Sequence, residues 1–233
     1  MASQYNNTQI ITDGLIHYLD FANPRCYVSG SNIANNLGSA FNATMSLQHG
    51  VTAFYTSSFG GGLVGMQVTA SLTASNFAVI NNGITYNNNF TIVVGAQMPS
   101  VLAGTNNAIS YDTAGSISIQ GYRLRSDGQQ LFDTFDFSNP PNRSALLPNI
   151  YMVSKNSTSG TIWMFNDIIN RTTTATGNLP RNIRDVKYFV GNADNNVLYS
   201  NCTVYFSMFY NRALSVLEMN QIYNVFKGRF RLS

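Results

Sequence analysis

Charged residues are scarce in this 233-residue chain. They make up 10% of it, against roughly 25% in an ordinary soluble domain, and glutamate occurs once and lysine three times. Because glutamate and lysine are good helix formers, a mostly helical protein is excluded. No apolar run approaches the ~20 residues that a membrane-spanning helix needs, so the sequence predicts no contact with a membrane interior.

Cysteine and histidine occur only twice each. Two cysteines make neither a disulfide framework nor a metal cluster, and no metal site is predicted. Cys26 and Cys202 are either two buried thiols or one bridge between the two ends of the chain, and their spacing leaves both open. Serine-nucleophile elbow, zinc-protease and phosphate-loop motifs are all absent, so no cofactor is predicted.

The net charge of +3 is carried by scattered basic residues. They crowd only within 181–187 and 227–231, whereas nucleic-acid binding needs a stripe or patch. We therefore expect no nucleic-acid partner. The first residues are polar and lack a basic segment followed by an apolar one, so no secretory signal is expected and a secreted lectin is disfavoured.

Short polar residues are abundant instead. Asn, Ser, Thr and Gly together account for 90 of the 233 residues, while hydrophobic residues at 44% suffice for a core and exclude wholesale disorder. Asn, Ser and Thr lose less rotamer freedom than Lys or Glu when they are immobilised. Such a surface suits a repeated protein lattice or the binding of sugars, and composition does not separate the two.

Hydrophobic segments alternate with Asn/Gly/Ser/Thr clusters along the whole chain, without a linker or repeat. This pattern predicts one antiparallel β domain over residues 1–233, with an N-terminal arm at 1–12 and a loop at 29–50. The run at 90–96 has no polar face and predicts a central strand buried on both sides. Strands are expected near 15–21, 90–96, 116–124, 131–137, 149–154, 161–166, 186–190 and 202–210, and a Gly-rich loop that enters a strand is expected at 59–68.

Trp163 is the only tryptophan and lies in the second strand of the hairpin expected at 149–166. Tryptophan is seldom left on an exposed edge, so we expect it to be buried. If it lay flat and exposed, it would instead favour sugar binding.

One helix is predicted at the C-terminus, from about 216 to 227, within a closing segment at 215–228. Ser215 and Glu218 form a capping box that satisfies two orphan N–H groups, and Gly228 suits the position after the helix. Leu214 and Met219 have the spacing of a hydrophobic staple. An apolar stripe is expected from Leu217, Ile222, Val225 and Phe226.

Both ends of the chain carry familiar motifs. Asp13–Pro24 reads DGLIHYLDFANP, and Phe209–Ser215 reads FYNRALS, followed by Glu218 and KGRF at 227–230. These segments resemble the laminin-G-like, concanavalin A-like jelly-roll domains of phage and large-virus structural proteins. The resemblance implies an all-β, two-sheet antiparallel sandwich closed by a C-terminal helix. It makes Asn211, Arg212, Ser215, Glu218 and Gly228 structural motif residues.

Relatives of this fold include glucanases, whose chemistry needs paired carboxylates. The only glutamate is assigned to the capping box, and Asp133 and Asp136 are three apart, so on one strand they face opposite sides. No catalytic residue is predicted. His17 is interpreted as a packed strand residue rather than a base. Asp20, Asp167 and Asp194 are candidates either for an oxygen-ligand cation site or for turn formation. Turn formation is the preferred interpretation.

The leading hypothesis is a non-enzymatic virion structural protein. It would be a capsid decoration or cement protein on the particle surface, a homo-oligomer that contacts the major capsid protein or other virion proteins. The alternative is a carbohydrate-binding adhesin of a phage tail or head fibre that contacts host surface glycans.

Overall fold

The longest strands of the computed structural model gather in one antiparallel sheet with the order β14-β13-β12-β7-β16-β5-β4, and β1 also pairs with β16. The structure describes residues 9–28, 30–31, 33–39, 44–48, 55–57, 63–68, 76–80, 89–97, 106–108, 122–125, 130–132, 135–137, 148–155, 161–165, 171–174, 186–190 and 202–232. The strands of this sheet are β1 (Leu15–Asp20), β4 (Tyr55–Ser57), β5 (Leu63–Val68), β7 (Phe90–Gln97), β12 (Asn149–Lys155), β13 (Thr161–Phe165), β14 (Arg171–Thr174) and β16 (Cys202–Tyr210).

Strand β7 lies at the centre of this sheet, between β12 and β16. Its residues from Phe90 to Ala96 are all buried, which confirms the prediction from the uninterrupted apolar run. Two strands pair with the side of β16 that faces away from β7. There β1 pairs with Phe206–Tyr210 and β5 pairs with Cys202–Val204, so the first and last parts of the chain are joined in the middle of the fold.

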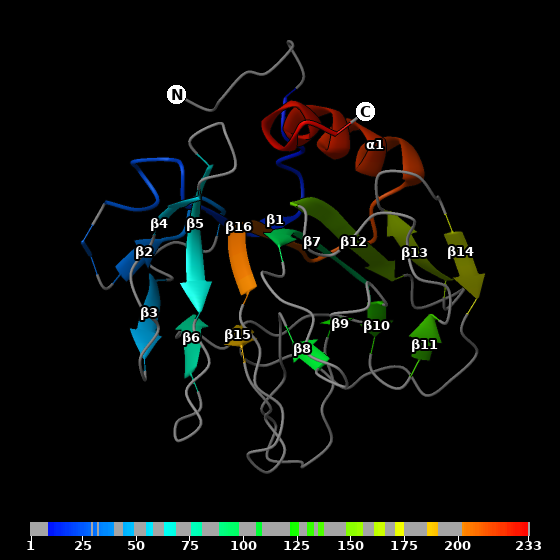
Figure 1. The fold of residues 1–233 in the computed structure, drawn as a ribbon. Coiled ribbons are helices and arrows are strands. Elements are labelled where there is room, and N and C mark those ends of the chain that lie inside the picture. The colour runs from blue at the N-terminus through cyan, green and yellow to red at the C-terminus, as the bar shows by residue number, and fades with distance from the viewer. Residues whose placement is uncertain are drawn as a thin grey trace.

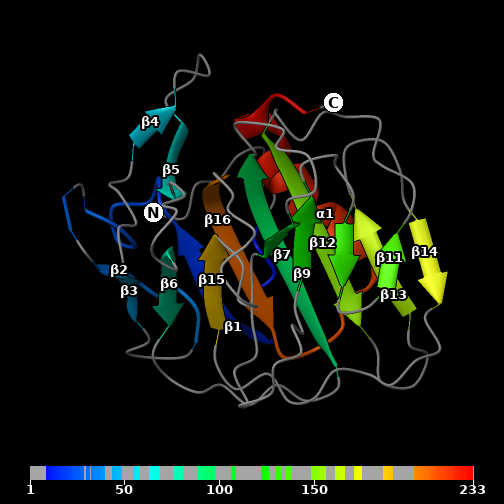
Figure 2. The same cartoon turned by 60° about the horizontal axis from the view of Figure 1, so that its bottom comes forward.

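Two smaller antiparallel sheets form a second layer, with the orders β11-β10-β9-β8 and β15-β6-β3-β2. Strands β8 and β15 are in contact, and Figures 1 and 2 show both sheets against one face of the large sheet. The predicted all-β, jelly-roll-like antiparallel sandwich is therefore confirmed. The strands are β2 (Ile33–Asn35), β3 (Thr44–Gln48), β6 (Asn76–Ile80), β8 (Asn106–Ala108), β9 (Tyr122–Arg125), β10 (Gln130–Phe132), β11 (Phe135–Phe137) and β15 (Val186–Val190).

The helix α1 (Val216–Phe226) covers the opposite face of the large sheet, followed by the 3₁₀ turn η1 (Lys227–Phe230) (Figure 1). The ring of Phe206 stacks on Phe226 with the centroids 4.0 Å apart, and Phe230 lies 5.8 Å away. Gly95 on β7 leaves the space for this stack, because a Cβ there would overlap the Phe206 ring. The described part of the chain contains no helix long and apolar enough to cross a bilayer.

The end of the helix differs from its prediction. Gly228 does not follow the helix in a left-handed conformation but lies inside η1, and Arg231 takes the left-handed position with φ 54°. The N–H groups of Arg231 and Leu232 donate to the carbonyls of Gly228 and Lys227, which closes the last turn. The extra turn exists because it brings Phe230 into the core.

The predicted apolar stripe of α1 included one residue, Leu217, that is not buried. Leu217 is 81% exposed, while the buried residues of α1 are Met219, Ile222, Tyr223, Val225 and Phe226. At 100° per residue, Leu217 lies about 200° from Met219 and so points away from the sheet.

Two predictions about strands were wrong. The segment 29–50 is not all loop, because it contains β2 and β3. The run 131–137 is not one strand, because the chain reverses within it and Phe132 pairs with Phe135 across β10 and β11. The period-two alternation continues across the reversal, so the pattern does not reveal it. The argument that Asp133 and Asp136 face opposite sides of one strand therefore fails.

Several predictions fall outside the described residues, or on side chains that are not described. The extent of a single domain over 1–233 also stays a prediction. The positions concerned are 1–8, His49, the strand start at 116–121, Asp133, Trp163, Asp167, Asp194 and the side chain of Cys202.

Candidate functional site

The predicted capping box is present at the start of α1. The Ser215 hydroxyl accepts from the Glu218 N–H at 3.3 Å, and the Glu218 carboxylate accepts from the Ser215 N–H at 2.8 Å. Arg212 adds two further bonds to this carboxylate, at 2.6 and 3.1 Å. The Arg212 guanidinium, together with the Ser215 donors, lowers the pKa of Glu218 to about 2. The only glutamate is thereby held as a structural anion.

Asn211 and Arg212 connect this helix start to the first strand. The Asn211 N–H donates to the Gly14 carbonyl, and Arg212 pairs with the Asp13 carboxylate at 2.9 Å. Gly14 has φ +74°, and a Cβ there would lie 2.9 Å from the Asn211 side chain. These residues close the fold.

His17 faces the opposite side of the large sheet and is fully buried. Its ring lies edge-on to Phe209 at 6.3 Å, and neither ring nitrogen has a hydrogen-bond partner in the described part of the chain. Burial alone lowers the pKa of His17 to about 4, so it is neutral at physiological pH. The interpretation of His17 as a packed strand residue is confirmed, because the side chain is fully buried against Phe209.

Asp20 forms a buried ion pair with Arg229 at 2.8 Å. Its carboxylate also accepts from the Ala22 N–H and from the Tyr18 hydroxyl, both at 3.1 Å. Asp20 thus shapes the turn after β1, as predicted, and is neutralised by an arginine. The described residues hold no group of three His, Cys, Asp or Glu side chains that suits a metal ion. Cys26 is a free, buried thiol whose sulfur accepts from the Asp20 N–H at 3.3 Å.

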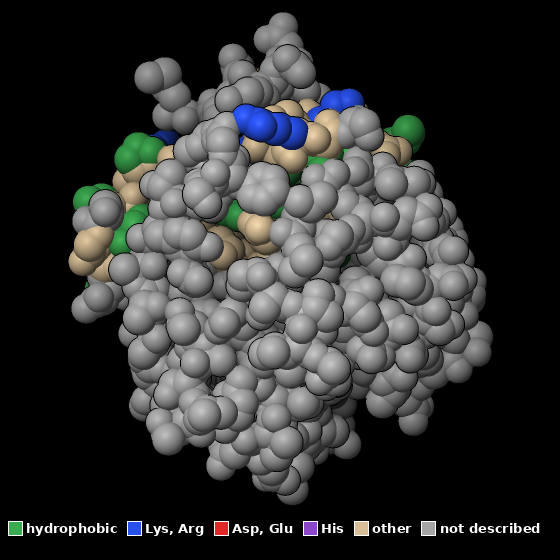
Figure 3. Space-filling view, viewed as in Figure 1, with side chains coloured by type: hydrophobic (Ala, Val, Ile, Leu, Met, Phe, Trp, Pro, Cys, Tyr) green, Lys and Arg blue, Asp and Glu red, His purple; other side chains and the backbone are tan. Residues whose placement is uncertain are grey.

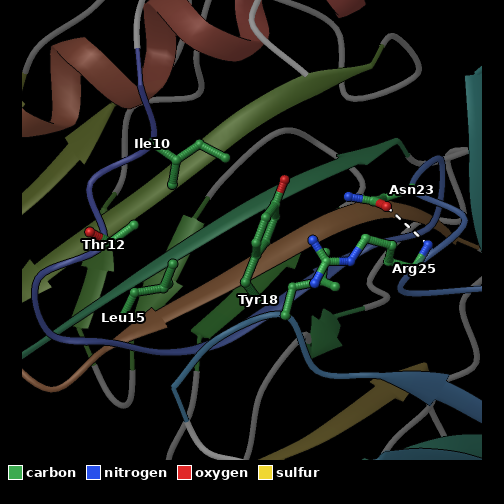
Figure 4. Close-up of a pocket in the computed structure, with 7 residues that line it drawn as sticks. Ile10, Thr12, Leu15, Tyr18, Asn23 and Arg25 are labelled. Atoms are coloured by element: carbon green, nitrogen blue, oxygen red, sulfur yellow. Dashed lines mark hydrogen bonds between the residues drawn. The ribbon is translucent and has the colours of Figure 1, made fainter. Parts of the chain in front are cut away.

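A hollow of about 180 Å³ opens beside β1, between the N-terminal arm and the turn after β1 (Figure 4). Leu15, Tyr18, Ile10 and Leu37 contribute apolar surface to it. Its described lining is Ile10, Thr12, Leu15, Tyr18, Asn23, Arg25 and Leu37.

The turn at Asn23 places Arg25 at this hollow. The Asn23 N–H donates to the Asp20 carbonyl, its own carbonyl accepts from Cys26 and Tyr27, and its side-chain oxygen accepts from the Arg25 N–H at 3.0 Å. Asparagine before proline is a turn signal, because the amide bonds to the following backbone and proline fixes φ. Arg25 is therefore held on the outside of the turn, where it is exposed.

The other walls are held by contacts between distant segments. The Leu37 N–H donates to the Tyr18 carbonyl at 2.8 Å, so this segment runs along β1. The arm is tied down where the Tyr210 hydroxyl donates to the Ile11 carbonyl at 3.0 Å and the Gln221 amide donates to the Gln9 carbonyl at 2.7 Å. The hollow therefore needs both ends of the chain.

Polar groups at the rim are free to bind a ligand. The Arg25 guanidinium, the Thr12 hydroxyl and the Asn23 side-chain NH₂ have no hydrogen-bond partner among the described residues. The Tyr18 hydroxyl is engaged by Asp20, and burial, reinforced by Asp20, raises the pKa of Tyr18 well above its ordinary value. The hollow therefore offers an apolar and aromatic floor with hydrogen-bond donors around it.

Sequence reasoning did not find this hollow. It identified the strand at 15–21, but nothing local indicates that the arm and Leu37 meet beside Tyr18. The predicted motif residues Asn211, Arg212, Ser215 and Glu218 lie together at the helix start, and none of them lines the hollow.

No protein-family profile matches the sequence. No curated protein matches it either.

Solved structures do resemble the fold. Trypanosoma rangeli sialidase in complex with sialic acid is similar with a TM-score of 0.64 and 11% identity, over 93% of this chain and 33% of the sialidase. Botulinum neurotoxin type C is similar with a TM-score of 0.65 and 11% identity, over 92% of this chain and 51% of the toxin chain. The binding domain of Paraclostridial Mosquitocidal Protein 1 is similar with a TM-score of 0.58 and 14% identity, over 89% of this chain and 51% of that chain.

The chain thus spans between a third and a half of the structures it resembles. At these identities the likeness establishes the β-sandwich fold and nothing finer. The coarser part of the predicted resemblance, an antiparallel β-sandwich, agrees with these neighbours.

Proposed function

We propose that this protein is a carbohydrate-binding protein and that the hollow beside β1 is its sugar site. The observation that carries the proposal is the combination of an apolar, aromatic floor with donors from Thr12, Asn23 and Arg25 that no described residue engages. A sugar ring presents apolar C–H faces and a belt of hydroxyl groups, so it needs both kinds of surface in one place.

The size of the hollow fits one sugar ring. At about 180 Å³ it exceeds the ~150 Å³ cavity that accommodates benzene, and it is smaller than the roughly 300 Å³ or more of a drug-sized pocket. One terminal ring would enter, and the rest of the glycan would lie along the surface. Such a contact binds weakly on its own and gains strength when several copies bind together.

The similar structures support this function over capsid decoration. The sialidase was solved with sialic acid, and cell uptake of botulinum neurotoxin type C depends on interaction with two ganglioside molecules. Both are carbohydrate ligands. The decoration of a virion surface, its capsid partners and the homo-oligomer stay predictions, as does the expectation that the chain is not an enzyme.

The experiment is a glycan array with the full chain, followed by calorimetric titration of the best ligand. Thr12→Trp should fill the hollow and weaken binding at least about tenfold, because the sugar ring loses its apolar contact. Thr12 is exposed and its hydroxyl has no described partner, so the variant should fold.

Leu217→Trp is the matched control, because it adds the same ring at an exposed position of α1 outside the hollow. It should bind like the unaltered protein. Failure to bind any glycan, or equal binding by Thr12→Trp, would overturn the proposal.

A further inference from the structure

The charges around the hollow are not balanced. The three acidic side chains that the structure describes, Asp13, Asp20 and Glu218, each pair with an arginine at 2.6–2.9 Å. Arg25 has no such partner among the described residues, and it is the only charged residue in the described lining. The hollow therefore has an uncompensated positive charge at its rim.

The described acidic side chains near the hollow are already paired with other arginines. On the face seen in Figure 3, the described surface carries lysine and arginine side chains and no acidic side chain. Asp13, which follows Thr12 in the chain, is bound to Arg212 at 2.9 Å, and Asp20, two residues after Tyr18, is 4% exposed and bound to Arg229. An anion from outside is the group that would complete this site.

Arg25 is also oriented toward the hollow. Its backbone is held by the Asn23 side chain at 3.0 Å, and Figure 4 shows its guanidinium directed toward Tyr18, on the side of the apolar floor. Because the turn fixes the backbone from which the guanidinium reaches the hollow, less backbone ordering remains to be done on binding.

We propose that the hollow takes a terminal sugar that carries a carboxylate, and that Arg25 is the residue that selects it. This inference rests on the proposed carbohydrate function. The planar guanidinium fork presents two parallel N–H donors, and a carboxylate attached to a sugar ring presents two oxygens at the matching spacing. The ring itself lies on Tyr18 and Leu15, and Thr12 and Asn23 face its hydroxyl groups.

The test compares matched glycans on one array: a sialylated glycan, the same glycan without sialic acid, the methyl ester of the sialylated form and a sulfated form. The full chain should bind the sialylated glycan at least about tenfold more tightly than the uncharged forms, which is the lower limit for a hydrogen bond to a charged group. The sulfated form should bind more weakly than the carboxylated one.

Three variants assign the preference to Arg25. Arg25→Gln should lose the preference for the carboxylate while it keeps weak binding to the uncharged glycan. Arg25→Lys should keep part of the preference, because it retains the charge but not the fork. Lys227→Gln is the charge-matched control outside the hollow and should behave like the unaltered protein.

The outcomes separate the two proposals. Equal binding of the sialylated glycan, its methyl ester and the glycan without sialic acid would overturn the selection by Arg25 and leave the sugar site standing. Tighter binding of the sulfated form, or an unchanged preference in Arg25→Gln, would also overturn it. Absence of binding to every glycan would overturn both.

Discussion

Two side chains of types that often act in catalysis, Glu218 and His17, have structural roles in this protein. Glu218 is a cap and an ion-pair partner, with its pKa lowered to about 2. His17 is a buried ring whose neighbours give its nitrogens no hydrogen bond. The side chains left free for binding, Thr12 and Arg25, are ordinary surface residues whose position alone distinguishes them.

Ser215→Ala should lower the free energy of unfolding by roughly 0.5–2 kcal/mol, because the hydroxyl that accepts from the Glu218 N–H is removed. Chemical denaturation measures the change. Ser215→Asn supplies another capping oxygen and should stay close to the original stability. Equal losses in both variants would show that the cap contributes little.

His17 should make the protein sensitive to mild acid. Its pKa of about 4 in the folded state lies below the ordinary 6.5, so the unfolded chain binds the proton first. Its contribution to stability is therefore complete above about pH 6.5 and is lost as the pH falls toward 4. Between about pH 7.5 and pH 5 the loss should be about 2 kcal/mol.

His17→Leu removes the titrating group, so the variant should lack this part of the acid destabilisation. Unfolding measured at both pH values for both proteins gives the difference. A parallel decline in the two proteins would show that other groups cause it.

At the scale of elements, the protein is organised around the contact between β7, β16 and α1. Phe206 on β16 stacks on Phe226 of the helix, and Gly95 on β7 provides the space beside it. The helix is short, at 11 residues, and a helix of that length is marginal in isolation. Its stability therefore depends on this packing.

Gly95→Ala should destabilise the protein by about 1–3 kcal/mol, because the added methyl group overlaps the Phe206 ring. Thermal or urea unfolding measures the loss. Phe206→Leu provides room for the methyl group, so Gly95→Ala should cost less in that background. If the stability losses of Gly95→Ala and Phe206→Leu simply add up, the overlap with the Phe206 ring is not the cause of the loss.

At the scale of the whole molecule, the two ends of the chain hold each other. Asp20 and Arg229 are 209 residues apart, and Arg212 bonds to the backbone of Asp13 across 199 residues. The N-terminal motif and the C-terminal motif meet at these contacts. The hollow is lined by residues 10–37, and Tyr210 and Gln221 from the C-terminal part hold the arm that forms one of its walls.

Arg229→Met should lower stability by about 3–5 kcal/mol, because it leaves the Asp20 carboxylate buried without its cation. The combination with Asp20→Asn should recover part of the loss, since no unpaired charge then remains. Denaturation of the single and double variants makes the comparison. If the free-energy losses of the two single variants simply add up in the double variant, Asp20 and Arg229 have no coupling free energy.

Where the signal is local, the sequence by itself determined the result. Ser215 and Glu218 predicted the start of α1, because a cap needs only residues three apart. The apolar run at 90–96 predicted the central strand, because burial on both faces removes all alternation. The missed reversal inside 131–137 shows the limit, because the same alternation continued through it.

Only the tertiary structure decided the features that depend on distant partners. Gly228 lies within a 3₁₀ turn because Arg229 and Phe230, one and two residues further on, find partners in Asp20 and Phe206. The candidate site has the same origin. Its lining comes from residues 10–37, where the Leu37 N–H bonds to the Tyr18 carbonyl, and the arm is held in place by Tyr210 and Gln221 near the other end of the chain. Contacts between irregular segments leave no periodic pattern in the sequence.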